Sequence, residues 1–243
     1  MENNLERLQK VIANNSDISR RKAEELIAKG KVIVNDQVVT ELGTKVSNSD
    51  EIIVDGQVIY HHEKVYYLLN KPIKTVSSRS DDRGRTTVVD LIHESDKIYP
   101  VGRLDYYTTG LLVLTNDGEL ANGLMHPRHQ VEKRYRVKFS GEFNEDKLKQ
   151  LRYGVDIGGY TTKRAKVKLI SFDKKNKVGR LELIISEGKN QQVRKMIEAI
   201  GCKVVTLKRT GYAIFDLDQE ALAPGAYRVI KPKEVKLLYS LIK

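Results

Sequence analysis

The chain is poor in the residues that disulfides, structural metal sites and membrane segments require. Its one cysteine, Cys202, excludes an internal disulfide. Cysteine and histidine do not cluster at the short spacings typical of structural zinc sites. No apolar run approaches the roughly 18 residues of a membrane span, and the first ten residues contain no apolar signal core. We therefore expect a cytoplasmic protein that binds neither a metal nor a membrane.

Negative charge is also in short supply. The sequence contains 43 lysine and arginine residues against 32 aspartate and glutamate residues, a formal net charge of +11. A surplus of this size favours a polyanionic partner, most often a nucleic acid. A basic surface that only aids solubility has the same composition, and the sign of the charge does not distinguish RNA from DNA.

The first 60 residues have the pattern of two short helices followed by short strands. A second helix is expected from Arg20 to Lys29, with Ser19 as its N-cap and Gly30 at its end. The dipeptides Asn35–Asp36 and Asp55–Gly56 interrupt apolar runs and predict two hairpin turns. The first helix is expected from apolar residues that recur on one face, namely Leu5, Leu8, Val11 and Ile12.

Cations gather at the first turn of the second predicted helix, which reads Ser19–Arg20–Arg21–Lys22. A helix dipole favours anions at this end, so basic side chains beside free backbone N–H groups would suit a phosphate. An exposed charged turn is the simpler alternative. With the residues that follow, the segment resembles the S4 RNA-binding domain, which implies binding of structured RNA through shape and phosphate contacts.

The rest of the chain contains more predicted strands than helices. Alternating apolar patterns predict strands at 131–140, 164–173 and 179–187, and helical spacing predicts a helix at 192–200. We expect an α+β fold with an antiparallel or mixed sheet flanked by helices. The predicted division is a small S4-like domain over residues 1–61 and a larger catalytic domain over 62–243.

A single carboxylate stands out in VGRLDYYTTGLLVLTNDG, the stretch that begins at Val101. Asp105 follows Arg103 closely and precedes the apolar run 111–114, which reads as a buried strand. Aspartate commonly forms turns, and a turn is the default explanation. A carboxylate can also be a covalent nucleophile. Arg103 lies on the same face of an extended segment, where it would favour the ionised form.

Two further residues have both a structural and a functional interpretation. Tyr135 shares a strand face with Val137 and Phe139, so it is either a core residue or a stacking platform for a base. Arg194 lies off the apolar face of its predicted helix, so it is either a surface residue or a cation directed into a site. These residues alone identify no reaction.

Four segments together resemble the RsuA/RluB branch of the pseudouridine synthases in order and spacing, and this branch also carries an N-terminal S4 domain. The segments are NKP at 70–72, the Asp105 stretch, EKRYRV at 132–137 and SEGKNQQVRKMIEAIG at 186–201. The resemblance implies isomerisation of a uridine in structured RNA without a cofactor, with large-subunit rRNA as the expected target. Nothing in the sequence points to an obligate partner chain, so we expect a monomer.

The resemblance also implies roles for individual residues. Asp105 falls on the nucleophile, Tyr135 on the tyrosine that packs on the target base, and Arg194 on the cation that pairs with the aspartate. Leu183 falls on a position that lines the pocket. Apart from the resemblance, our own hypothesis is that Arg103 inserts into the RNA helix or contacts the flipped backbone. Attack by Asp105 on the ribose or on the uracil ring remains open.

This sequence departs from the branch at a few positions near the predicted site. Tyr107 stands where asparagine is general, Thr109 where serine is usual, and Lys74 where glycine is usual. The preceding Lys71 and Pro72 match a motif usually regarded as structural. The departures leave the three active-site positions intact but bear on loop shape and target preference.

Other functions remain compatible with parts of the sequence. The same enzyme class acts on small-subunit rRNA or tRNA as well. A non-catalytic RNA-binding factor for ribosome assembly would have the same charge and S4-like module, but would not need Asp105, Tyr135 and Arg194 together. A DNA-binding protein is less well supported, because no motif for reading the major groove is recognisable.

Overall fold

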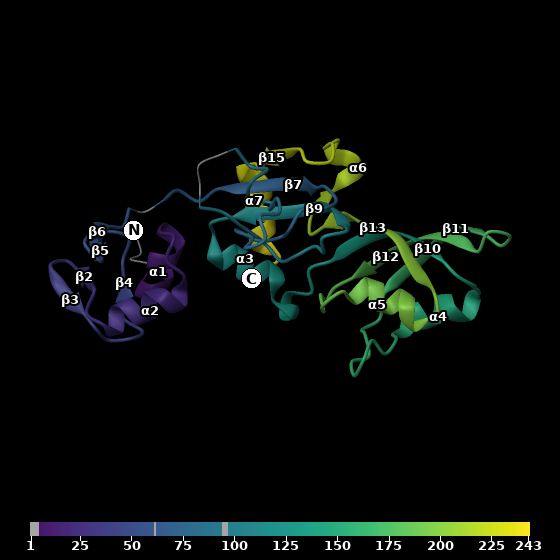
Figure 1. The fold of residues 1–243 in the computed structure, drawn as a ribbon, viewed down its shortest axis with the longest axis horizontal. Coiled ribbons are helices and arrows are strands. Elements are labelled where there is room, and N and C mark those ends of the chain that lie inside the picture. Colours follow the sequence, from purple (N-terminus) through teal and green to yellow (C-terminus); the bar gives the residue numbers. More distant parts are fainter. Residues whose placement is uncertain (1–4, 61, 94–96) are drawn as a thin grey trace. The chain divides into compact units, whose positions relative to one another are not determined.

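The protein is described here from a computed structural model that covers residues 5–60, 62–93 and 97–243. The chain divides into two compact units, one formed mainly by the chain up to Val65 and the other by the chain from Tyr66 onward (Figure 1). The domain boundary predicted at residue 61 falls on His61, outside the described ranges. Within those ranges, no helix is both long and apolar enough to cross a membrane.

In its described residues, the N-terminal unit has two helices and two small sheets. One sheet has the strand order β3-β2-β5-β6, and the other pairs β1 with β4. The elements are β1 (Glu6–Arg7), α1 (Leu8–Asn15), α2 (Arg20–Ala28), β2 (Val32–Val34), β3 (Gln37–Val39), β4 (Lys45–Val46), β5 (Ile52–Val54) and β6 (Gln57–Val58). Apolar residues from both helices and from β2, β4 and β5 form its core.

Most of the local predictions for this unit are confirmed. The Ser19 hydroxyl accepts the backbone N–H of Lys22 at 3.2 Å, so Ser19 is the N-cap of α2. Both hairpin dipeptides adopt left-handed φ angles, for example 47° at Asn35, as type I′ turns require. The prediction for Leu5 was wrong. Helix α1 begins only at Leu8, because residues 6–7 are extended and paired with β4, and Leu5 is 55% exposed.

The second unit is built on one mixed sheet, as the α+β prediction expected. Within the described residues it has nine strands, seven of them in the order β11-β12-β10-β13-β9-β7-β15, while β14 pairs with β13 and β8 with β9. The strands are β7 (Tyr66–Lys71), β8 (Tyr99–Pro100), β9 (Thr108–Thr115), β10 (Lys133–Ser140), β11 (Lys166–Asp173), β12 (Val178–Ile185), β13 (Lys203–Tyr212), β14 (Phe215–Asp216) and β15 (Tyr227–Val229).

Helices cover the sheet of this unit. Residues of α3 and α7 pack with β7 and β9 in one apolar core, while α5 packs on β13 and α4 on β11. The helices are α3 (Gly118–Met125), the 3₁₀ turn η1 (Pro127–His129), α4 (Glu145–Tyr153), α5 (Gln192–Ala199), α6 (Leu217–Glu220) and α7 (Pro232–Ser240). Every residue of the predicted buried run 111–114 has no exposed surface, so β9 is a rigid support for the segment before it.

Strands β9 and β13 pair in parallel, and they join the two halves of the sheet. Their register places Gly110 beside Arg209. Gly110 has a φ of 109°, and a Cβ built there would lie 2.1 Å from the carbonyl oxygen of Arg209. Only glycine permits this backbone approach. The glycine therefore sets the distance between the Asp105 segment, which precedes β9, and the strands on the far side of the junction.

Candidate active site

Asp105 lies in the short connection between β8 and β9, and its backbone is held from several sides. The ammonium of Lys71 donates to the Asp105 carbonyl at 3.2 Å and to the Thr108 carbonyl at 2.9 Å. The Thr108 N–H also donates to the Asp105 carbonyl, at 2.9 Å. The hydroxyl of Ser77 donates to the carbonyl of Leu104 at 2.8 Å and accepts its N–H at 3.1 Å. These bonds fix the position from which the carboxylate projects.

The Asp105 carboxylate faces a cation from helix α5. The Nε atom of Arg194 lies 3.5 Å from Oδ2 of Asp105, and its Nη2 donates to the Thr108 hydroxyl at 3.3 Å. The two charged side chains are 22% and 31% exposed, so a substrate can reach them. Arg194 is 89 positions away in sequence, and the fold brings it to the aspartate as the family resemblance implied.

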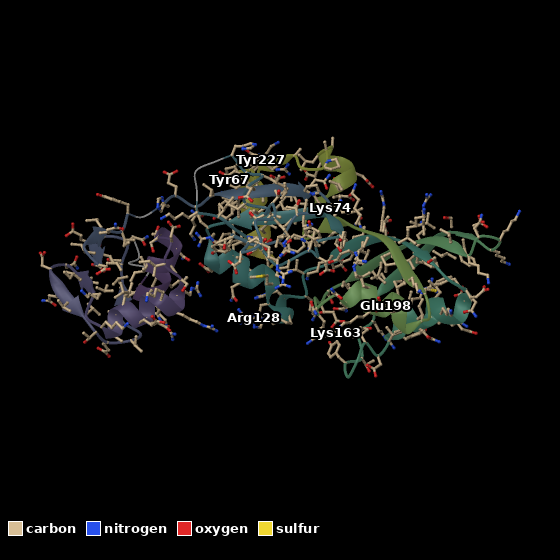
Figure 2. All side chains as sticks on the ribbon, in the orientation of Figure 1. Tyr67, Lys74, Arg128, Lys163, Glu198 and Tyr227 are labelled. Atoms are coloured by element: carbon tan, nitrogen blue, oxygen red, sulfur yellow. The ribbon has the colours of Figure 1, made fainter. Side chains whose placement is uncertain are left out.

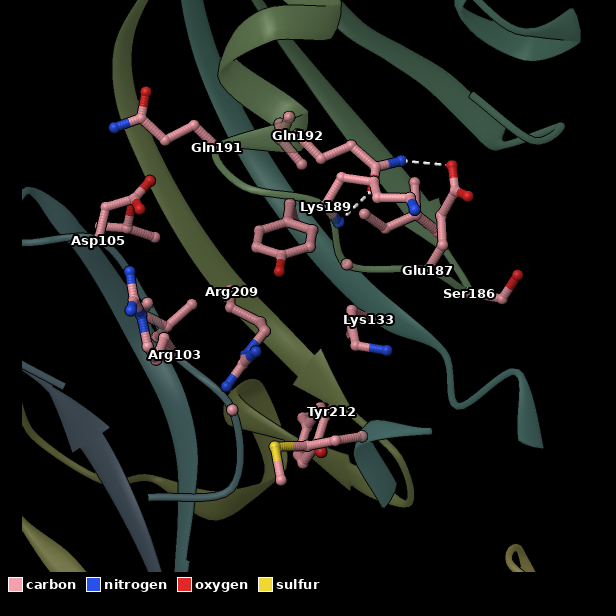
Figure 3. A pocket seen from close by; sticks show the side chains of 18 of the residues that line it. Arg103, Asp105, Lys133, Ser186, Glu187, Lys189, Gln191, Gln192, Arg209 and Tyr212 are labelled. Carbon is pink, nitrogen blue, oxygen red and sulfur yellow. Dashed lines mark hydrogen bonds between the residues drawn. The ribbon is translucent and has the colours of Figure 1, made fainter. Parts of the chain in front are cut away.

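A cavity of about 360 Å³ opens beside this pair (Figure 3). Its wall includes Asp105, Arg103 and Tyr135, which is 8% exposed and comes from β10. Tyr135 lies between Leu183 on β12 and Arg209 on β13 in the sheet register. The fold therefore assembles a carboxylate, a cation and a tyrosine around one concave site.

Leu183 and Arg103 differ in how they meet this cavity. Leu183 is completely buried beneath the surface, and Ile185 is the residue of β12 that lines the cavity. In the sheet register Leu183 is the neighbour of Tyr135 on β12, and its place in the wall stays a prediction. Arg103 is exposed, and it also lines a second cavity of about 420 Å³, which shares Leu104, Asp105 and Gln191 with the first.

Positive charge dominates the lining of the first cavity. The lining contains the carboxylates of Asp105 and Glu187 and the cationic side chains of Arg103, Lys133, Lys163, Lys189 and Arg209. Lys163 is labelled in Figure 2 and the others in Figure 3. Burial, together with the nearby guanidinium of Arg209, lowers the pKa of Lys133 to about 8 against the opposing pull of Glu187. Burial raises the pKa of Tyr212 to about 12, so this phenol stays neutral. The site suits an anionic ligand or intermediate.

Glu187 joins two loops at the far wall of the cavity. It accepts the hydroxyl of Tyr160 at 2.6 Å, the backbone N–H of Lys163 at 3.0 Å and the side-chain amide of Gln192 at 2.5 Å. The ammonium of Lys189 lies 4.4 Å from the centre of the Tyr160 ring. The loop before α5 and the loop before β11 are thereby held together, with Lys163 and Lys189 on the cavity side.

The predicted phosphate-binding residues belong to the other unit. Ser19, Arg20, Arg21 and Lys22 are exposed on the first turn of α2, where Lys22 forms an ion pair with Glu25 at 3.1 Å. Their side chains are therefore accessible to a ligand, and the capped helix start leaves basic groups beside backbone N–H donors.

Sequence reasoning missed several residues of the cavity, among them Arg209, Glu187 and Tyr160. One signal for Arg209 was present. In the strand KVVTLKRTGY, Arg209 comes two positions after the buried Leu207. Alternation along a strand therefore predicts that both side chains lie on the same inward face. No local sequence pattern predicts the hydrogen bond between Tyr160 and Glu187.

Residues 65–199 match the RNA pseudouridylate synthase family, so the chain belongs to that family. The fold and this site are therefore those of an RNA-modifying enzyme. Residues 6–52 match the S4 domain. The chain is 50% identical over 238 residues to the ribosomal large subunit pseudouridine synthase B of Bacillus subtilis (strain 168), covering 98% of this chain and 97% of the relative.

Other relatives agree along the whole chain. An RNA pseudouridine synthase of Aquifex aeolicus (strain VF5) is 38% identical over 240 residues, covering 97% of this chain and 94% of the relative. A crystal structure of a pseudouridylate synthase superposes with a TM-score of 0.68 at 32% identity, covering 96% of this chain and 99% of the other. Both parts of the chain therefore occur together in related enzymes.

Proposed function

We propose that this protein converts one uridine of large-subunit ribosomal RNA to pseudouridine. The Asp105–Arg194 pair beside a cationic cavity carries the proposal, because a carboxylate in this position could act as a nucleophile on a flipped nucleotide whose base enters the cavity. The choice of large-subunit rRNA rests on the B. subtilis relative, whose name states that target.

In the proposed reaction, the uridine leaves its helix and its base enters the cavity. Base flipping costs a few kcal/mol, and stacking on Tyr135 offsets about 1–3 kcal/mol of that cost. Asp105, which Arg194 faces at 3.5 Å, attacks either the ribose or the uracil ring. The base then turns and rejoins the ribose through carbon, which requires no net oxidation or hydrolysis.

The remaining assignments are parts of the same proposal. Arg103 is exposed beside Asp105 and contacts the RNA backbone or fills the gap left by the flipped base. The basic turn of α2, Ser19 to Lys22, binds rRNA phosphates in a separate domain that ends near residue 61. The enzyme acts as a monomer in the cytoplasm.

Pseudouridine mapping in a deletion strain tests the target. One pseudouridine of large-subunit rRNA should disappear and should return with a plasmid copy of the wild-type gene. The Asp105→Asn variant should bind the rRNA fragment normally but fail to restore the modification. Asp146→Asn is the control, because Asp146 is an exposed residue of α4 whose carboxylate contacts only Lys149 in the described ion pairs. If Asp105→Asn restored the modification, the nucleophile assignment would be wrong.

A further inference from the structure

We propose that Arg209 is a catalytic residue that donates a hydrogen bond to a carbonyl oxygen of the target uracil and stabilises the negative charge that forms there. The inference rests on the proposed function and adds a residue to it. Arg209 comes from β13, on the opposite side of the parallel strand junction from Asp105, and lines the same cavity. In Figure 3 its side chain lies between those of Asp105 and Arg103 on one side and that of Lys133 on the other.

The guanidinium of Arg209 is buried but only partly satisfied. The residue is 3% exposed. Its Nε donates to the carbonyl of Leu111 at 2.7 Å, and its central carbon lies 4.5 Å from the ring centre of Tyr212. Its Nη2 is buried and has no hydrogen-bond partner among the residues that the structure describes. Within these residues, no carboxylate forms an ion pair with it.

An arrangement of this kind is costly unless something else binds there. A buried cation without a counter-charge loses its hydration and gains no ion pair, and a buried N–H without an acceptor loses a hydrogen bond. Arg209 lines the cavity, so a ligand bound there can supply both the acceptor and the negative charge once the guanidinium turns Nη2 toward it. A uracil carbonyl meets the geometric requirement, and an anionic uracil meets the electrostatic one as well.

Both routes open to Asp105 place negative charge on the base. If Asp105 attacks the anomeric carbon, the bond from that carbon to N1 breaks, and its electron pair delocalises from N1 onto O2 and O4. If Asp105 adds to C6, the electron pair of the C5–C6 double bond moves to O4 as an enolate. The bond from the anomeric carbon to N1 then breaks and leaves its electron pair on N1 and O2. When C5 bonds to the anomeric carbon, the carboxylate leaves, the proton on C5 is lost and N1 gains one. A fixed donor at O2 or O4 therefore assists either route.

The other cations of the cavity are less suited to this role. Arg103 is exposed. The ammonium of Lys133 already donates to the carbonyl of Val131 at 2.7 Å, and that of Lys189 lies against the Tyr160 ring. Lys163 is exposed on its loop. Among the described cations of the lining, Arg209 combines burial with a donor that has no partner.

The backbone of Arg209 is also held in place before substrate arrives. It pairs with Tyr135 on one side and with Gly110 on the other. The close approach of Gly110 leaves little room for the strand to shift. A donor on a fixed backbone needs little reorganisation to stabilise a charged transition state, so we expect the contact to affect the chemical step more than RNA binding.

The test compares single-turnover rates and RNA affinities of Arg209→Gln, Arg209→Lys and wild type on an rRNA fragment. Arg180→Gln is the matched control, because Arg180 is exposed on β12 and lies outside the cavity lining. We expect Arg209→Gln to slow turnover about 100-fold or more, as loss of an oxyanion donor does. RNA affinity and the unfolding midpoint of a folded variant should stay close to wild type. A folded Arg209→Gln with a rate within about threefold of wild type would overturn the proposal.

A second arm uses the wild-type enzyme, in case the Arg209 variants fail to fold. The target uridine is replaced by 2-thiouridine or 4-thiouridine, since sulfur accepts hydrogen bonds more weakly than oxygen. One substitution should slow single turnover at least tenfold, and the penalty should shrink in Arg209→Lys. Equal rates on all three substrates would overturn the proposal. Failure of the proposed function is distinguishable, because the wild type would then modify no uridine at all.

Discussion

The ammonium of Lys71, a residue with no exposed surface, donates a hydrogen bond to the backbone carbonyl of Asp105 at 3.2 Å. The same ammonium also donates to the carbonyls of Pro72 and Thr108. One buried cation therefore joins the end of β7 to the segment that carries the proposed nucleophile. This arrangement is a physical reason for the structural role expected of the NKP segment.

Replacing Lys71 with methionine should destabilise the protein and slow the reaction. The substitution keeps most of the side-chain volume but leaves the three carbonyls without their charged donor, at an expected cost of about 2–4 kcal/mol in the free energy of unfolding. Urea denaturation measures this loss, and single-turnover kinetics measure the effect of a looser Asp105 segment. Lys168→Met, an exposed residue of β11, is the control. A loss below about 0.5 kcal/mol, the range of ordinary surface substitutions, would contradict the expectation.

Gly110→Ala should be among the most damaging substitutions in the catalytic unit. The added Cβ would meet the backbone of Arg209 at 2.1 Å, and the φ of 109° is unfavourable for alanine. We expect a loss of about 3 kcal/mol or more in unfolding free energy, or failure to fold. Gly158→Ala separates the two causes, because Gly158 has a φ of 95° but nothing within 4 Å of its Cβ position. If both variants lost the same stability, the strand contact would not be the cause.

Lys74→Gly should stabilise the protein slightly. Lys74 has a φ of 60° (its side chain is marked in Figure 2), and its N–H donates to the Tyr106 carbonyl at 2.9 Å. This left-handed conformation is more favourable for glycine than for lysine. Relief of strain should exceed the added chain entropy by about 0.5 kcal/mol. Thermal unfolding would show the gain, with Lys168→Gly as the control in an extended strand; a lower midpoint for Lys74→Gly would contradict it.

Stability should rise with pH above 8 because of Lys133. Burial and the charge of Arg209 lower the pKa of Lys133 from 10.5 to about 8, with Glu187 opposing. Between these values the unfolded chain is protonated and the folded one is not, so the free energy of unfolding increases as pH rises. The expected increase is about 1–3 kcal/mol from pH 7.5 to 10.

Urea denaturation of wild type and Lys133→Met across this pH range isolates the contribution of Lys133. Titrations elsewhere in the protein cancel in the difference between the two proteins. The stability of wild type relative to the variant should grow as the pH rises through 8. A difference that stays constant with pH would show that Lys133 is not perturbed.

Features that depend on neighbouring residues could be predicted well from the sequence. The Ser19 cap, the hairpin turns at Asn35–Asp36 and Asp55–Gly56, and the inward face of the strand around Tyr135 all follow from local hydrogen bonding, φ preferences and a period of two. The wrong predictions concern residues whose conformation depends on a segment distant in the sequence. Leu5 was misplaced because pairing with β4 keeps residues 6–7 extended.

The sequence by itself determined the order of the elements and, through the resemblance of four segments, the family and the identity of Asp105, Tyr135 and Arg194 as candidates. Only the tertiary structure decided how these residues meet. The parallel pairing of β9 with β13 at Gly110 joins segments about 100 positions apart, and no local pattern encodes such a contact. That pairing brings Arg209 to the cavity beside Asp105. The neighbours of a buried charge depend on how distant segments pack, and spacing along the chain does not determine them.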